Sequence, residues 1–330
     1  MKGRYLGVIA VVIIGVIVAA AFVVLIPSTT PAKKIKVAMS LDGGANLPGW
    51  SQTGFLAIQE VEEIFGAEIA YSEFIGFADA LRDLETFAGQ GFDLVWGHGG
   101  QYADVVEITD KYPNTYFMTT GTIEFNSQVR AYGPKWQEMT YLAGILAGSI
   151  TKSNKVGIVL GGEFPVLKMI ANGTIEGVKE VNPDAEVTSA FVGSFIEPVK
   201  GKDFATSMIQ SGVDVLVSWA GFTSTGMFEA ARANPGVHII TEHQDYFELG
   251  TDVSIATYRM NFTPNLVETA QMVVDGTFQG GYFTPGIKEG VLDFTDISTE
   301  VVPQSVRDEI AQVRQDIIDG NIVAPEIWPE

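Results

Sequence analysis

The chain has 330 residues with 40 acidic and 20 basic side chains, no cysteine and three histidines, which gives a net charge of −20. This charge argues against nucleic acid or an anionic membrane surface as a partner of the folded part. The lack of cysteine excludes disulfides, thiolate catalysis and cysteine-ligated metals. The histidines show no helical ligand spacing, so we expect no metal and no cofactor. The length favours two domains.

The N-terminus carries the one segment typical of a membrane protein. Lys2 and Arg4 precede residues 6–26, which contain no charged residue and are long enough to span a bilayer. Basic residues on that side favour a cytoplasmic N-terminus with the rest of the chain outside. We therefore expect residues 1–34 to be an uncleaved membrane anchor plus a polar linker. The alanines at 19–21 leave a cleaved signal segment as the alternative.

Residues 36–65 set the pattern that the rest of the chain repeats. A short apolar run, typical of a buried strand, ends in Asp42 and a loop with three glycines and a proline. Apolar residues then recur at helical spacing. In such a strand–loop–helix unit a ligand lies at the carboxyl end of the strand, where Asp42, Asn46 and Trp50 stand. A loop that merely caps the helix and covers the core would use the same residues.

Strand-like and helical segments alternate through the rest of the chain and restart near residue 155. The expected strands are 68–76, 93–96, 116–120, 129–132, 155–162, 186–192, 214–219, 237–241 and 252–260, and the expected helices are 78–89, 102–112, 136–150, 165–181, 200–211, 223–233, 264–276 and 303–320. This alternation predicts parallel sheets with helices on both faces. We expect an α/β fold of two Rossmann-like lobes of related topology.

The ends of the predicted strands and the loops after them collect aromatic, carboxylate and amide side chains. The candidate binding residues are Asp42, Asn46, Trp50, Trp96, His98, Trp219, Phe222, Glu242, Arg259 and Asn261. Aromatic rings stack on the faces of a planar ligand, while acids and amides bind its N–H and O–H groups. This set predicts a site for a flat, polar, largely uncharged molecule. The alternative is that many of these residues only cap loops or edge the core.

Residues 161–186 (GGEFPVLKMIANGTIEGVKEVNPDAE) are similar to the Gly-Gly…Pro…Gly-x-x-x-Gly-x-x…Asn-Pro-Asp segment of the basic membrane protein family of ABC-transporter solute receptors. Further segments at 141–144, 193–202 and 212–215 match in the same order. The resemblance implies a type I periplasmic binding protein fold, in which three crossovers join two lobes around a ligand. The implied boundaries are 35–125 and 250–284 for the first lobe, 126–249 and 285–330 for the second, and 124–129, 242–251 and 283–288 for the hinge.

The resemblance extends to part of the candidate site. The residues that match the opening of the nucleoside-binding branch are Asp42, Gly43, Gly44 and Asn46. Trp50 stands where a stacking phenylalanine is expected, and Glu242 or Asp245 stands for an acidic residue near the ninth strand. The lysine expected on the last strand is missing, and Asn261 falls near its place. The resemblance therefore implies ring stacking and leaves ribose contacts open.

We interpret the chain as an extracytoplasmic solute receptor, anchored in the cell membrane by its N-terminal helix. It would hand a small planar solute, such as a purine nucleoside or nucleobase, to an ABC permease and its ATPase subunits without performing chemistry. One alternative is the sensing ectodomain of a membrane signalling system. Another is a nucleoside hydrolase, which would need clustered carboxylates that the sequence does not show.

Overall fold

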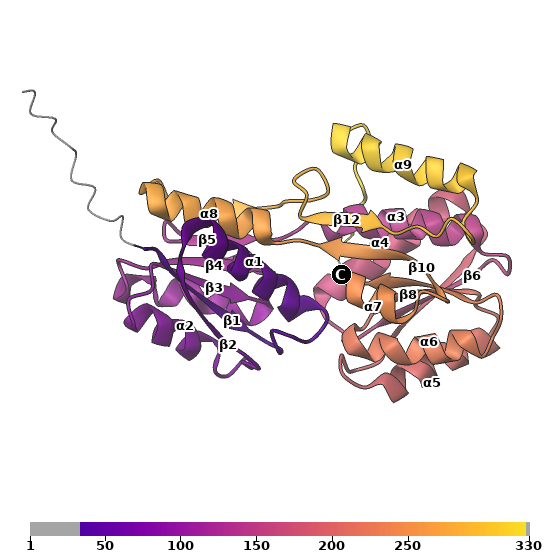
Figure 1. The fold of residues 1–330 in the computed structure, drawn as a ribbon. Coiled ribbons are helices and arrows are strands. Elements are labelled where there is room, and N and C mark those ends of the chain that lie inside the picture. The colour runs from indigo at the N-terminus through magenta and orange to yellow at the C-terminus, as the bar shows by residue number, and fades with distance from the viewer. Residues whose placement is uncertain (1–33, 328–330) are drawn as a thin grey trace, which may run out of the picture. The chain divides into compact units, whose positions relative to one another are not determined.

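The computed structural model describes residues 34–327, except for the side chains of Gln244 and Asp245. The described residues belong to one compact unit that contains two six-stranded sheets (Figure 1). The predicted membrane anchor at residues 6–26 lies outside them. Within residues 34–327, each helix is too short or too polar to cross a membrane.

The first lobe is built on a sheet of strand order β11-β5-β4-β3-β1-β2, in which each pairing is parallel. Its strands are β1 (Lys36–Leu41), β2 (Glu68–Ser72), β3 (Leu94–His98), β4 (Tyr116–Thr120), β5 (Val129–Tyr132) and β11 (Gly281–Phe283). Helices α1 (Trp50–Phe65) and α8 (Thr263–Asp275) pack together over one face, and α2 (Ala80–Gly89) covers the other (Figure 1). Both faces of β1 are therefore buried, as its continuous apolar sequence predicts.

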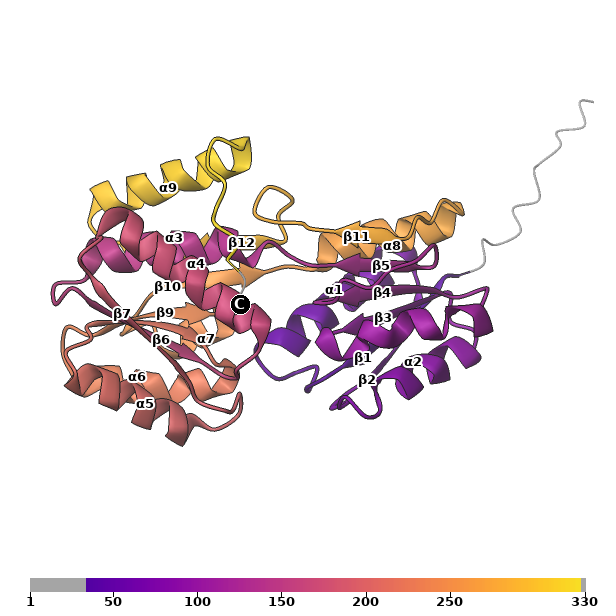
Figure 2. The same cartoon turned by 180° about the vertical axis from the view of Figure 1, so that it is seen from behind.

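The second lobe has the strand order β12-β10-β9-β8-β6-β7. Its strands are β6 (Lys155–Leu160), β7 (Glu186–Phe191), β8 (Val215–Trp219), β9 (His238–Glu242), β10 (Ser254–Met260) and β12 (Leu292–Thr295), and only the β10–β12 pairing is antiparallel within the described sheet. Helices α3 (Trp136–Ile150) and α4 (Pro165–Val181) cover one face, while α5 (Pro198–Gln210) and α6 (Thr225–Arg232) cover the other (Figure 2). The C-terminal helix α9 (Gln304–Asp319) packs on α3.

The predicted α/β fold of two parallel-sheet lobes is confirmed, with local differences. The expected helix at 102–112 is a pair of 3-10 helices, η1 (Gly100–Glu107) and η2 (Thr109–Lys111). Strands β11 and β12 and the short helix α7 (Gln244–Leu249) were not expected. They contain three, four and six residues, too few for a clear hydrophobic period.

The chain passes between the sheets at 133–135, 261–262 and 284–291, so two of the three predicted hinge positions are wrong. The first crossing comes later than 124–129 because β5 pairs with β4 and β11 of the first sheet. The second is not at 242–251, since β10 still pairs with β9. The first lobe therefore extends beyond the expected boundary at 125 to include β5, and β10 belongs to the second lobe.

Hydrogen bonds tie the crossing segments to one another. The amide of Lys135 donates to the oxygen of Pro285 at 2.9 Å, and the amide of Asn261 donates to the oxygen of Val291 at 2.8 Å. The buried carboxylate of Glu138 accepts a bond from the amide of Ile287 at 2.8 Å. Few backbone groups join the lobes elsewhere, so these segments are where a change of lobe angle would be absorbed.

Arg130 of β5 is buried beside β11, the edge strand of the first sheet. It donates to the oxygen of Gln279 at 3.1 Å, pairs with Glu268 at 3.1 Å and lies 3.7 Å from the ring centre of Phe283. A buried guanidinium needs such partners because an unpaired one costs several kcal/mol. Arg130 thus fastens α8 and β11 to β5.

Candidate ligand-binding site

The order of the strands defines where a ligand would bind. The sequence order reverses between β1 and β3 in the first sheet and between β6 and β8 in the second. In open α/β sheets ligands bind in the crevice at the carboxyl ends of the strands beside such a reversal. Asp42 follows β1, His98 ends β3 and Trp219 ends β8, so these three predicted residues occupy such positions.

Trp50 and His98 form a stacked pair in the first lobe. Their ring centres are 4.2 Å apart and their planes differ by 3°. The indole N–H of Trp50 donates to the backbone oxygen of His98 at 3.3 Å. A Cβ atom at Gly54 would lie 2.8 Å from the His98 ring, so this glycine lets α1 approach β3 closely enough for the stack.

His98 is neutral at physiological pH. Its side chain is fully buried, and this burial lowers its pKa to about 3. Nε2 lies 3.0 Å from the backbone oxygen of Trp50, which can only accept, so Nε2 carries the proton. Nδ1 is then an acceptor, and it is buried without a protein partner.

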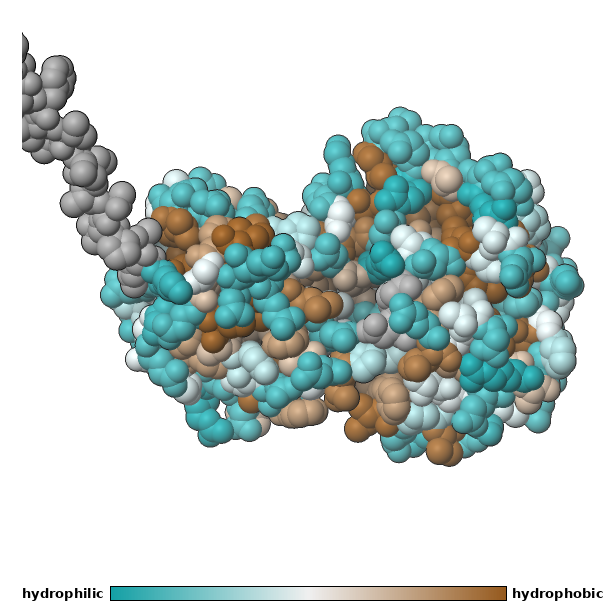
Figure 3. Space-filling model, in the orientation of Figure 1, coloured by the Kyte–Doolittle hydropathy of each residue, from teal (hydrophilic) through white to brown (hydrophobic). Residues whose placement is uncertain are grey.

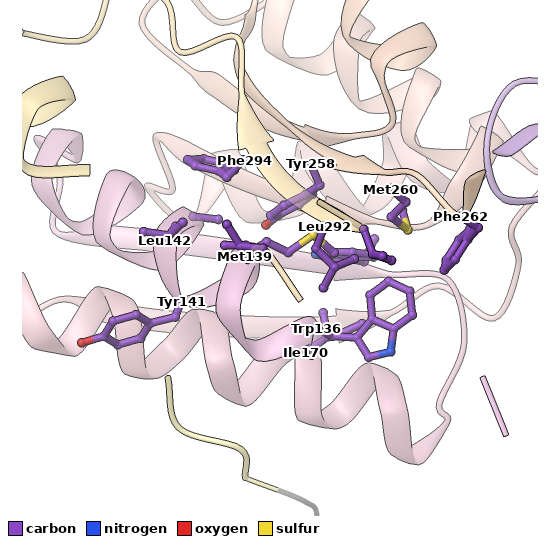
Figure 4. Packing of buried hydrophobic residues seen from close by; sticks show 14 of the residues in the cluster. Trp136, Met139, Tyr141, Leu142, Ile170, Tyr258, Met260, Phe262, Leu292 and Phe294 are labelled. Atoms are coloured by element: carbon purple, nitrogen blue, oxygen red, sulfur yellow. The ribbon is translucent and has the colours of Figure 1, made fainter. Parts of the chain in front are cut away.

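An aromatic row continues from the Trp50–His98 pair into the second lobe. Trp136, the first residue of α3, lies 6.0 Å from Trp50 and 6.3 Å from Trp219, and Trp219 lies 4.6 Å from Tyr258. Trp136 was not among the predicted site residues because it opens an apolar helix that reads as core. In Figure 4 the indole of Trp136 lies on the same side of the cluster as Phe262, and the ring of Tyr141 lies at the opposite side and points away from it.

At the end of β9, the carboxylate of Glu242 is surrounded by hydrogen-bond donors. One carboxylate oxygen, Oε1, accepts bonds from the amides of Ala220 and Gly221, the former at 2.6 Å, and from the hydroxyl of Ser224 at 3.0 Å. Ser224 in turn contacts the hydroxyl of Ser218. Burial raises the pKa of Glu242 to about 7, although the three donors oppose this shift. Its second oxygen takes part in none of these bonds.

The remaining residues at the loop ends are more exposed. Asp42 accepts a bond from the Ser51 hydroxyl at 2.7 Å, and desolvation by the surrounding protein raises its pKa despite that bond. Asn46 is exposed, and Phe222 of η3 (Gly221–Ser224) is 47% exposed. These three side chains have surface available to a solute, and Asp42 also holds the start of α1 through Ser51.

Three of the predicted site residues have other roles in this structure. Trp96 is fully buried and donates to the hydroxyl of Thr120 at 2.9 Å, so it supports the stack from inside the core. Arg259 alternates with the buried Tyr258 along β10, so it points to the opposite face, where it pairs with Asp296 at 3.7 Å. The carboxamide oxygen of Asn261 accepts from the amide of Thr263 at 3.0 Å, which caps the entry to α8.

Two further polar atoms of the aromatic row lack a hydrogen bond of good geometry. They are the indole nitrogen of Trp219 and the hydroxyl of Tyr258, both buried. Buried polar atoms without a hydrogen bond are rare, because each costs about 1–3 kcal/mol. Trp219 and Thr174 are close enough to the Tyr258 hydroxyl to oppose the rise of its pKa, whereas Nδ1 of His98 is an acceptor without a protein partner along the same row.

No group of acids, histidines or cysteines within residues 34–327 is arranged to hold a metal ion. The chemical character of the row is aromatic and polar, without a Lys or Arg side chain among the residues named for it. Such a surface suits stacking and hydrogen bonding to a planar molecule.

Comparison with known proteins gives a consistent match over the described chain. The model of one family, described as ABC transporter substrate-binding protein, PnrA-like, matches residues 34–327. An ABC transporter nucleoside-binding protein of Lactococcus lactis is 29% identical over 281 residues, with 79% of each chain covered. A purine-binding protein of Brucella abortus is 26% identical, with 82% of this chain and 78% of that protein covered.

Among solved structures, an ABC transporter solute-binding protein of Aeropyrum pernix superimposes with a TM-score of 0.77. It is 23% identical, and the match covers 89% of this chain and 94% of that one. At this identity the likeness establishes the shared two-lobed fold.

Proposed function

Because the chain belongs to the PnrA-like family of ABC transporter substrate-binding proteins, we propose that it captures a purine nucleobase or nucleoside between its lobes and delivers it to an ABC permease. The family is one of solute-binding proteins. Two relatives are a nucleoside-binding and a purine-binding protein, which supports this choice of solute.

The observation that carries the proposal is the aromatic row that runs from Trp50 through Trp136 to Trp219. A planar base stacks on such rings, and each stack contributes about 1–3 kcal/mol. Glu242 at one end offers a carboxylate oxygen to an N–H or O–H group of the solute. Asp42 and Asn46 line the opposing loop, and their exposed side chains leave room for either a base or a sugar hydroxyl.

The charge of the site favours an unphosphorylated solute. His98 and His243 are held neutral by burial, which lowers their pKa values to about 3 and about 4. Among the residues named for the row and for the loops at its ends, the charged side chains are Asp42 and Glu242, and both are acids. A phosphate would therefore meet no Lys or Arg among these named residues and would be repelled by the carboxylates.

A thermal-shift screen followed by calorimetry tests the proposed solute class. We expect purine bases or nucleosides to raise the melting temperature by mass action, and the corresponding nucleotides to do so far less. A shift with sugars or amino acids, and none with purines, would contradict the proposal. Incubation with nucleosides should release no free base, which distinguishes the receptor from a hydrolase.

Delivery to a permease is supported by exposed apolar side chains on the loops after β6 and β7 and on the first turn of α5. Ile196 and Val199 are 78% and 73% exposed, and the rings of Phe164 and Phe195 stack beside them at 6.4 Å. Hydrophobic groups also break the mostly hydrophilic surface in Figure 3. Exposed apolar clusters of this kind are typical of protein interfaces.

Uptake into proteoliposomes that contain the permease tests this docking role. Ile196→Glu should reduce uptake while leaving the solute dissociation constant unchanged. Val274→Glu, on an exposed position of α8, is the matched control and should leave both quantities unchanged. Equal uptake by both variants would refute a docking role for the loop at Ile196.

We also propose that residues 6–26 anchor the protein with its lobes outside the cell.

A further inference from the structure

Helix α7 of the second lobe contacts the loop after β1 in the first. The hydroxyl of Tyr246 donates a hydrogen bond to the backbone oxygen of Pro48 at 2.8 Å. Pro48 stands two residues before Trp50, in the loop that begins at Asp42. Tyr246 is 2% exposed, so this bond between the lobes is shielded from water and is stronger for it.

The backbone on the α7 side of this contact is strained. His243, which precedes α7, has a φ of 58°, in the left-handed region that residues other than glycine rarely adopt. Strain of this kind persists where the surrounding structure holds it, and it concentrates at functional sites. Because His243 directly follows Glu242, the same turn fixes both the carboxylate and the start of α7.

The loop on the Pro48 side of this contact also has an unusual backbone conformation. Gly49 has a φ of 112°, and a Cβ atom there would lie 2.9 Å from the hydroxyl oxygen of Tyr246. Only glycine therefore lets the loop reach Tyr246 without a collision. The contact thus connects Glu242 in one lobe with Trp50 in the other through a few residues on each side.

We propose that Tyr246 is a latch that holds the lobes together around bound solute and so sets how long the solute stays bound. The proposal rests on the proposed function, since it takes Trp50 and Glu242 as solute-binding residues. The Tyr246–Pro48 bond joins the two lobes directly, so it must break whenever they separate. Losing the latch shifts the equilibrium toward the open form, from which solute escapes.

Tyr246→Phe removes the hydroxyl and keeps the ring, and stopped-flow kinetics with the tightest-binding purine measures its effect. One net hydrogen bond corresponds to dissociation that is about 2- to 13-fold faster, with little change in the association rate. Tyr102→Phe is the matched control, because Tyr102 donates a 2.8 Å bond to Ser40 within the first lobe. A dissociation rate for Tyr246→Phe equal to that of the control and the parent protein would overturn the latch.

A double-mutant cycle tests the close approach at Gly49. Gly49→Ala should weaken binding, through its φ and through the clash with the Tyr246 hydroxyl. In the Tyr246→Phe background the φ penalty remains but the nearest clashing atom is gone, so the same substitution should have a smaller effect. Equal effects in the two backgrounds would contradict the proposed contact.

A measurement without solute separates failure of the latch from failure of the proposed function. The sequence contains no cysteine, so a pair of spin labels can be attached to the double variant Glu63→Cys and Asp203→Cys, with one label on α1 and one on α5. Both positions are exposed. The interlobe distance distribution should shift to longer values in Tyr246→Phe and not in Tyr102→Phe. If no purine binds at all, the proposed function fails, and an unchanged distribution in Tyr246→Phe still overturns the latch.

Discussion

Substitution of Glu242 by glutamine should change how stability depends on pH. The carboxylate has a pKa of about 7 in the folded protein because it is buried, against 4.5 for an ordinary glutamate. At a pH between 4.5 and 7, the folded protein holds a proton on Glu242 that the unfolded chain has released. The free energy of unfolding therefore falls as pH rises from 4.5 to 7.

The size of this effect follows from the shift. A difference of about 2.5 pKa units corresponds to about 3 kcal/mol of unfolding free energy, lost by the parent protein over that range. Glutamine keeps an oxygen for the amides of Ala220 and Gly221 and carries no charge. Glu242→Gln should therefore gain about 3 kcal/mol relative to the parent between pH 4.5 and pH 8.

Urea unfolding of both proteins without solute, at pH 4.5, 6 and 8, measures this difference. Taking the difference between variant and parent removes the opposing contributions of His98 and His243, whose lowered pKa values make stability rise with pH up to about 6.5. Glu229→Gln is the control, because Lys202 lowers the pKa of Glu229 and its difference should run in the opposite direction. A flat difference for Glu242→Gln, or one with the sign of the control, would refute the reasoning.

Three further outcomes are expected. Trp50→Ala should weaken purine binding roughly 5- to 150-fold by calorimetry, and normal affinity would exclude stacking on this ring. Trp219→Ala should weaken binding similarly and, because Trp219 is 5% exposed, should also lower the unfolding free energy by about 3–5 kcal/mol. Residues 34–330 alone should bind purine as tightly as the full chain, and a chelator should not change the affinity of either. Affinity that is lost with the chelator and restored only by zinc, magnesium or calcium would show a metal requirement.

The sequence predicted the two-lobed α/β fold because buried parallel strands read as continuous apolar runs. It did not predict which lobe holds β5 and β10, since both segments look equally suited to either sheet. Membership is decided by strand pairing, which joins β5 to β4 and β11 and joins β10 to β9 and β12. The resemblance gave the number of crossings, but no local pattern marks where they fall.

For the candidate site, too, the sequence predicted some features and missed others. Position after a strand correctly brought His98, Trp219 and Glu242 to the carboxyl edges of their sheets. It could not show that Arg259 points to the opposite face of β10, because a position at the end of a strand does not say which of two alternating side chains faces the site. Nor could it select Trp136, whose role depends on the packing of α3 against rings from both lobes.

The environment of Arg130 also constrains how the protein is made. Its carbonyl partner at Gln279 is 149 residues farther along the chain, which takes about 7 to 30 s to synthesise at ordinary ribosomal rates. During that interval the nascent first lobe has an open strand edge at β5 and a guanidinium without its later partners. The first lobe therefore begins to form first and is completed only after most of the second has been made. A chain that ends before β11 lacks the strand and the groups that close this edge, and an open edge of this kind promotes aggregation.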